Sequence, residues 1–188
     1  MQFSLVSPYV IWTDEVAAYG RESFWKGRPL VEAVQDLTAR IHDDFAYDTK
    51  TTTVSTTLPE VMKARSGVCQ DFAHLEIGCL RAMGLAARYV SGYLLTTPPP
   101  GKPRLVGADA SHAWVSVWVP GEGWLDFDPT NNLVPSDKHI TVGIGRDFGD
   151  VSPLRGVILG GGRHKIDVSV DVAPVDGECI QNPQLPNF

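Results

Sequence analysis

Residues 57–84 read TLPEVMKARSGVCQDFAHLEIGCLRAMG, and this stretch predicts two helices separated by a short break. Thr57 and Glu60 match a capping box, in which the hydroxyl and the carboxylate satisfy each other's unpaired amides. The first helix is therefore expected to run from this box to Arg65, where Ser66 and Gly67 interrupt it.

The second predicted helix begins at Cys69 and ends at Gly84, which supplies the left-handed residue common after helices. Its apolar side chains recur at helical spacing: Phe72, Leu75, Cys79, Leu80 and Met83. Cys69 is thus expected in the first turn of a helix.

Upstream, residues 29–41 predict another helix, because Pro29 suits a first turn and one face is apolar through Leu30, Val34, Leu37 and Ile41. Downstream the pattern changes to strands, predicted over residues 87–95, 112–119, 124–128 and 166–172. Helices first and strands later favour an α+β fold, with an antiparallel β-sheet packed on the N-terminal helices and on the cysteine-bearing helix.

Composition narrows the classes of function. A chain of 188 residues with 43% hydrophobic content suits a single domain over residues 1–188. The net charge of −6 and the scattered Lys and Arg residues argue against nucleic acid as a partner. Residues 1–8 lack the pattern of a secretory signal, and no apolar run is long enough to span a membrane, so we expect a cytoplasmic protein without membrane contact.

Cys69 is the candidate nucleophile. A helix N-terminus stabilises a thiolate through its unpaired amides and the positive end of its dipole. Gly67 removes side-chain bulk on the approach to the sulfur. The backbone N–H of Cys69 is also suited to binding a developing oxyanion.

A cysteine nucleophile needs a base, and His112 opens a strand in which alternate residues share a face: His112, Trp114, Ser116 and Trp118. The base in turn needs an orienting acceptor. Asp126 and Asp128 share one face of the following strand, and the pattern alone leaves both open as that acceptor.

The register of the hairpin tests this arrangement. A tight turn centred at Pro120 pairs His112 directly with Asp128. A loop over residues 120–123 instead slips the register by three residues, about 10 Å along the strand, and then requires a bulge or strong twist.

Four blocks of sequence together resemble the bacterial transglutaminase-like family, which is related to papain-like cysteine proteases. They are Gly67-Val68-Cys69-Gln70-Asp71-Phe72-Ala73, residues 86–93 (AARYVSGY), Ser111-His112-Ala113-Trp114, and residues 123–130 (GWLDFDPT). The blocks occur in order over residues 60–132, and the segments 145–147 and 151–153 resemble the family's C-terminal extension.

The resemblance implies a papain-like, transglutaminase-core fold and an acyl-enzyme thioester at Cys69. It implies His112 as the base, Asp128 in preference to Asp126 as its orienting partner, and no metal or cofactor. Many bacterial members carry an N-terminal β-rich domain, which is expected to be absent from residues 1–188.

Three functions follow as hypotheses. The first is hydrolysis of a peptide or amide bond in a peptide or protein substrate. The second, in the same chemical class, is transfer of an amine to glutamine. The third is a non-catalytic, peptide-binding module, which has no physical need for all three side chains. The sequence leaves the oligomeric state open.

Residues outside the three proposed catalytic positions also carry local signals. Gln70 and Trp114 are candidates for substrate contact, although Trp114 and Trp118 fit sheet packing equally well. Cys79 lies on an apolar face and is expected in the core, and Cys179 is expected to be incidental. Cys69, His74 and Cys79 are spaced around a helix, so they do not predict zinc. The loop 96–109 is a candidate border of the cleft, and Gly160-Gly161-Gly162 lacks the partners of a phosphate loop.

Overall fold

The computed structural model describes residues 2–95 and 111–153, together with Gly156, Gly160, Val170 and Val172. The loop 96–109, nearly all of the strand predicted over 166–172, Cys179, Gly161 and Gly162 lie outside the described residues. The elements in chain order are η1 (Gln2–Ser4), α1 (Asp14–Arg21), α2 (Leu30–Asp44), β1 (Ala46–Tyr47), α3 (Leu58–Ala64), β2 (Ser66–Gly67), α4 (Cys69–Ala82), β3 (Ala87–Leu94), β4 (Ser111–Val119), β5 (Gly123–Phe127), β6 (His139–Gly145) and α5 (Phe148–Val151).

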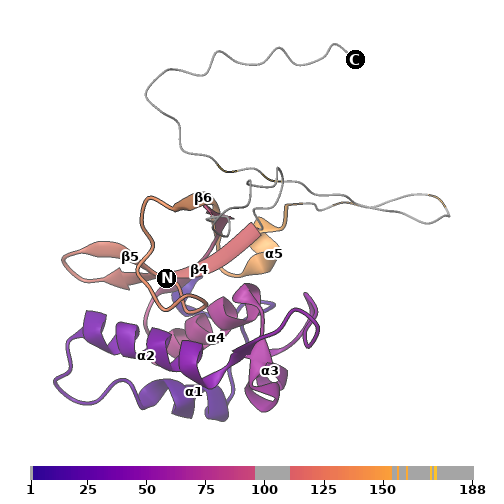
Figure 1. Ribbon diagram of the computed structural model, residues 1–188. Helices are drawn as coiled ribbons and strands as arrows, with labels where there is room; N and C mark the ends of the chain where they lie inside the picture. Colours follow the sequence, from indigo (N-terminus) through magenta and orange to yellow (C-terminus); the bar gives the residue numbers. More distant parts are fainter. Residues whose placement is uncertain are drawn as a thin grey trace, which may run out of the picture.

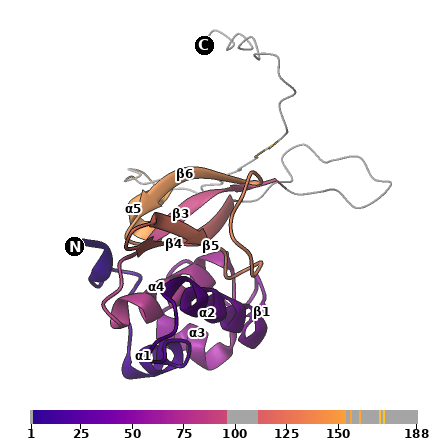
Figure 2. The ribbon, with the colours of Figure 1, turned by 90° about the vertical axis from the view of Figure 1, so that its left-hand side faces the viewer.

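Helices α1 to α4 form one layer, and a four-stranded sheet lies against it (Figure 1). Figure 2 shows the two layers from the side, with α5 next to β6. The strand order is β5-β4-β3-β6, and every neighbouring pair in this sheet is antiparallel. The predicted α+β class with an antiparallel sheet is confirmed. Strands β1 and β2, of two residues each, form a separate parallel sheet.

Helix α4 lies at the centre of the hydrophobic core and contacts both β3 and β4. The sheet residues that join this core alternate along their strands, as a half-buried sheet requires. The core members from these three elements include Phe72, Leu75, Ile77 and Leu80 of α4, Ala87 and Tyr89 of β3, and Ala113, Val115 and Val117 of β4. Burying a large apolar side chain stabilises the fold by about 1.5–3 kcal/mol, so this contact fixes the helix against the sheet.

The predicted helices form close to their expected bounds. Helix α2 begins at Leu30, one residue later than predicted because Pro29 is its N-cap, and extends past the predicted end to Asp44, with Val34, Leu37 and Ile41 fully buried. The capping box is present at α3, where Glu60 Oε2 accepts a hydrogen bond from Thr57 N at 2.8 Å. This helix ends at Ala64, one residue earlier than predicted, because Arg65 is left-handed with φ of 50°.

Helix α1 and strand β6 are among the elements that the sequence analysis did not predict, although each carries a local signal. Helix α1 has an N-cap, since Thr13 Oγ1 accepts a hydrogen bond from Val16 N, and two acidic residues fill its first turn. Strand β6 carries the alternating apolar residues Ile140, Val142 and Ile144, which are 43–64% exposed. Strand β6 pairs with β3 and extends the sheet beyond the predicted strands.

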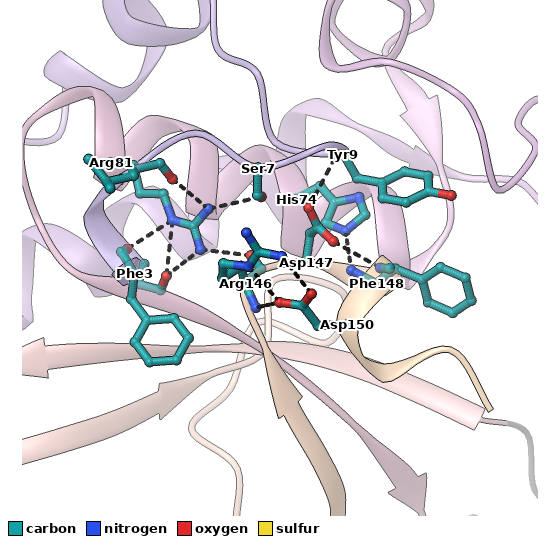
Figure 3. A network of polar contacts seen from close by, with 12 residues as sticks. Phe3, Ser7, Tyr9, His74, Arg81, Arg146, Asp147, Phe148 and Asp150 are labelled. Carbon is teal, nitrogen blue, oxygen red and sulfur yellow. Dashed lines mark hydrogen bonds and ion pairs between the residues drawn. The ribbon is translucent and has the colours of Figure 1, made fainter. Parts of the chain in front are cut away.

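A buried polar network joins the N-terminal segment, α4 and the connection from β6 to α5 (Figure 3). Arg81 of α4 is 2% exposed, and its guanidinium donates to the backbone carbonyls of Phe3, Leu5, Ala87 and Arg146 and to the hydroxyl of Ser7. The Arg81 side chain thus donates to five acceptor atoms and links helix α4 to three other segments of the chain.

The second half of this network centres on Asp147 and His74. Asp147 is 1% exposed, and its Oδ2 accepts a hydrogen bond from Tyr9 N at 3.0 Å. His74 Nε2 accepts from Phe148 N at 3.1 Å. Burial lowers the pKa of His74 to about 4, so the ring is a neutral acceptor at physiological pH. These contacts dock α5 beside the N-terminal half of α4.

Candidate active site

Cys69 is the first residue of α4 and is partly exposed. Its position is fixed by Asp71, a residue with 2% exposure whose Oδ2 accepts hydrogen bonds from Val68 N at 2.9 Å and from the Thr52 hydroxyl at 2.7 Å. A Cβ on Gly67 would lie 2.8 Å from Asp71 Cβ and Oδ2, so glycine leaves the space that this carboxylate occupies. These hydrogen bonds to Asp71 hold the first turn of the helix in place, so the helix begins at Cys69.

His112 and Asp128 form a close pair. The distance between His112 Nε2 and Asp128 Oδ2 is 2.7 Å, and the two side chains are 9% and 0% exposed. An ionised carboxylate only accepts hydrogen bonds, so the histidine donates through Nε2. The other ring nitrogen, Nδ1, is then the atom left to interact with the Cys69 side chain.

Electrostatics favour a protonated His112. Burial alone would lower the pKa of His112, but hydrogen bonds to Asp128 and to the Cys69 side chain, together with their negative charges, raise it to about 9. Burial would likewise raise the pKa of Asp128, whereas the hydrogen bonds and the charge of His112 hold it below its usual range. The pair is thus suited to carry an imidazolium beside a carboxylate at neutral pH.

The hairpin between β4 and β5 brings this pair together in a register that neither predicted alternative describes. Val119 pairs with Gly123 and Val115 pairs with Phe127, so the register is slipped by two residues from direct pairing of His112 with Asp128. Because side chains alternate with a period of two, this slip keeps the histidine and the aspartate on one face, with no bulge required in this hairpin.

The geometry distinguishes the two candidate acceptors. Asp126 Oδ2 accepts a hydrogen bond from the indole Nε1 of Trp114 at 3.0 Å, whereas Asp128 contacts His112. Asp128 also accepts backbone hydrogen bonds at Oδ1 from Thr130 N at 2.9 Å and Asn131 N at 3.2 Å. The turn after β5 thus holds the carboxylate toward the histidine.

Two further side chains reach Asp128 that the sequence did not indicate. Asn131 Nδ2 lies 2.7 Å and His139 Nε2 lies 3.1 Å from Asp128 Oδ2. Asn131 follows the Asp-Pro-Thr block directly, but His139 opens β6, which was not predicted as a strand. Its proximity depends on the pairing of β6 with β3, which places His139 opposite Leu94.

A cavity of about 350 Å³ opens beside Cys69 and His112. Its wall is largely apolar and comes from the connection before α3, the start of α4, strands β3, β4 and β6, and the α5 region: Val54, Val68, Cys69, Gln70, Tyr89, Ser91, Gly92, Tyr93, Ser111, His112, Ala113, Val142, Phe148, Val151 and Pro153. The thiol and the imidazole thus share a concave space that can hold a substrate group.

The structure separates the two candidate substrate-binding residues. Gln70 lies in the cavity wall, and its amide donates to Val54 O at 3.1 Å. Trp114 is fully buried and lies outside the cavity wall, so it packs within the protein rather than facing a substrate. Trp118 is 46% exposed and packs edge-on against Trp124.

The two described cysteines differ in burial, since Cys69 is partly exposed and Cys79 is buried. Cys79 is fully buried, its Sγ donates to Val16 O at 3.4 Å, and burial raises the pKa of its thiol. Cys79 belongs to the core, as predicted.

Among the described residues, His112, Asp128 and His139 have donor atoms within 4.8 Å of one another. Their N–O distances of 2.7 and 3.1 Å are hydrogen-bond lengths, shorter than the separation of about 3.3 Å between ligand atoms around tetrahedral zinc.

Comparison with known proteins identifies the family. The model of the transglutaminase-like superfamily matches residues 18–129, which is more than half of the chain and includes Cys69, His112 and Asp128. The chain belongs to the transglutaminase-like superfamily. The fold agrees, because a proposed cysteine protease from Cytophaga hutchinsonii superposes with a TM-score of 0.66 at 30% identity, covering 80% of this chain and 48% of the other.

Two sequence relatives resemble this chain over part of their length. An uncharacterised protein of Mycobacterium tuberculosis is 54% identical over 173 residues, which cover 89% of this chain and 55% of the relative. A protein-glutamine gamma-glutamyltransferase of Pseudomonas aeruginosa is 38% identical over 94 residues, which cover 50% of this chain and 12% of that enzyme. The chain thus spans about half the length of the mycobacterial relative. No helix among the described residues is long and apolar enough to cross a bilayer.

Proposed function

We propose that this protein is an enzyme that catalyses cysteine-dependent acyl transfer on peptide or amide bonds of a peptide or protein substrate, most readily as hydrolysis. The observation that carries the proposal is the 2.7 Å pair of His112 Nε2 with Asp128 Oδ2, set beside a thiol at the start of α4. A nucleophile, a base and an orienting hydrogen-bond acceptor are the three groups that this chemistry requires.

The proposed reaction proceeds in two steps. The Cys69 thiolate attacks the substrate carbonyl carbon, and His112 gives its Nδ1 proton to the leaving nitrogen as the C–N bond breaks, which leaves a thioester on Cys69. A water molecule then gives a proton to His112 and attacks the thioester, so that the C–S bond breaks and a carboxylic acid leaves. The backbone N–H of Cys69 suits stabilisation of the oxyanion in both steps.

Amine transfer is the second candidate. It uses the same thioester, but a primary amine replaces water and the product is a new amide. The 38% identity to the Pseudomonas aeruginosa gamma-glutamyltransferase across half of this chain favours it, whereas the likeness to the proposed cysteine protease of Cytophaga hutchinsonii favours hydrolysis.

Incubation with dimethylcasein and dansylcadaverine, followed by mass spectrometry, distinguishes these reactions. New peptide termini or released ammonia without dansyl label indicate hydrolysis, and incorporated dansyl label indicates amine transfer. Cys69→Ala should abolish either product, whereas Cys79→Ala, the matched control in the core, should retain it. If wild type and Cys69→Ala bind casein equally and neither forms product, the protein is a peptide-binding module and the proposed enzymatic function is wrong.

A further inference from the structure

Asp128 receives more hydrogen-bond donors than its oxygens normally accommodate. Its Oδ2 alone is approached by His112 Nε2 at 2.7 Å, Asn131 Nδ2 at 2.7 Å and His139 Nε2 at 3.1 Å. Two backbone amides occupy Oδ1. Since a carboxylate offers about four lone-pair sites, His139 competes with His112 for the charge of one oxygen.

His139 is held in this place by the surrounding structure. Its side chain is 3% exposed, and its ring meets the Trp114 ring edge-on at 5.3 Å and 83°. Nδ1 of His139 is buried and has no hydrogen-bond partner among the described residues, so the ring interacts through Nε2. A buried nitrogen without a partner is destabilising, and a merely structural position is better filled by an apolar side chain.

We propose that His139 is a positioning residue for the reaction at Cys69, which holds Asp128 by its Nε2–H and weakens the pull of that carboxylate on the proton of His112. This inference rests on the proposed function. The proton leaves His112 Nδ1 for the leaving nitrogen, and that transfer is easier when Asp128 holds the imidazolium less strongly. His139 thereby weakens the His112–Asp128 hydrogen bond, which would otherwise hold the proton of His112 too strongly for it to act as an acid.

The remaining ionisable groups around Asp128 leave His139 as the one to change. Glu76 of α4 is fully buried, and its pKa is raised to about 8 by burial, so it is largely uncharged at neutral pH. Asp126 of β5 is engaged by Trp114, and Cys69 of α4 interacts with His112 from the other side of the ring. None of these three groups donates to Asp128 Oδ2.

The test is an NMR titration of the His112 ring nitrogens in wild type, His139→Phe and His139→Gln. Loss of the donor in His139→Phe should move the His112 midpoint upward by about 0.5 pH unit, a three-fold gain in proton affinity. The amide of His139→Gln can donate from nearly the same position, so its midpoint should stay near that of wild type. His74→Phe, an equally buried substitution that does not touch Asp128, is the control for general destabilisation.

Coincident midpoints in wild type and a folded His139→Phe variant would overturn the proposal. If that variant does not fold, the wild-type spectrum decides, because the proposal requires a proton on His139 Nε2 throughout the His112 titration. An Nδ1–H tautomer of His139 would refute it. The titration needs no turnover, so its result is separate from the casein assay that tests the proposed function.

Discussion

At the scale of single residues, Asp128 rather than Asp126 is the hydrogen-bond partner of His112. Asp128→Asn should slow acylation of Cys69 by p-nitrophenyl acetate about 10²–10⁴-fold, because the histidine loses the acceptor that fixes its tautomer. The burst of p-nitrophenolate in stopped flow measures this rate.

Asp126→Asn is the matched control for that substitution. Its amide oxygen can still accept from the Trp114 indole, so the acylation rate should stay within a few-fold of wild type. Equal losses in the two variants would show that the structure assigns the wrong carboxylate.

Sequence predicted the three proposed catalytic side chains because each lies in a local pattern: a helix start, a strand start and a strand end. It could not separate Asp126 from Asp128 without family resemblance, because the two share a strand face. The sequence could not predict the contact of His139 with Asp128, because that contact depends on the tertiary pairing of β6 with β3. Burial of Trp114 was equally hidden, because alternation gives a face but not what covers it.

At the scale of elements, the start of α4 depends on Asp71. Asp71→Ala removes the acceptor of Val68 N and Thr52 and should cost about 1–2 kcal/mol of unfolding free energy. The substitution should also slow alkylation of Cys69, because the hydrogen bonds that hold the first turn of α4 are lost. Asp71→Asn retains an acceptor oxygen and should lose less of both. Urea denaturation and the iodoacetamide rate provide the two measurements, and unchanged alkylation in a folded Asp71→Ala would contradict this role.

Helix α4 also carries a buried acid that makes stability depend on pH. Burial raises the pKa of Glu76 to about 8, while Thr38 donates to its Oε1 at 2.8 Å. The folded state therefore holds this proton up to a higher pH than the unfolded state, whose carboxyl has a pKa near 4.3. Between these values the Glu76 contribution to stability falls as pH rises.

Glu76→Gln should flatten that fall, because an amide does not titrate. Urea denaturation at pH 5, 6, 7 and 8 gives the slopes for wild type and variant. The same decline in both would mean that other groups cause the pH dependence.

The elements themselves were predictable where local chemistry decides them. The capping box at Thr57 and the apolar faces of α2 and α4 specify helices without help from the rest of the chain. The hairpin register was not predictable, since turns of similar length give slips that differ by one residue. A slip of two keeps Asp128 on the histidine's face, whereas the considered slip of three would reverse it.

At the scale of the whole molecule, the Arg81 network joins the helical layer to the sheet and to the N-terminal segment. Arg81→Met leaves the carbonyls of Phe3, Leu5, Ala87 and Arg146 without this charged donor, and losing several such hydrogen bonds at once should lower the unfolding free energy by about 3–5 kcal/mol. Hydrogen exchange should rise first in residues 3–10.

Arg146→Met is the matched control for this loss. The Arg146 side chain forms a solvent-exposed ion pair with Asp150 at 2.8 Å, and the Arg146 backbone carbonyl still accepts from Arg81, so the free energy of unfolding should change little. Similar losses in both variants would show that the buried network does not hold the layers together.

Site-resolved alkylation measures directly whether His112 and Asp128 activate Cys69. Wild-type protein is treated with limiting iodoacetamide at pH 6.5 and digested, and the labelled cysteines are quantified by mass spectrometry, with His112→Ala in parallel. We expect dominant labelling of Cys69 in wild type, a loss of at least ten-fold in His112→Ala, and no labelling of Cys79 in either folded protein. Labelling spread evenly over Cys69, Cys79 and Cys179, and unchanged by His112→Ala, would contradict the activation of Cys69 by His112.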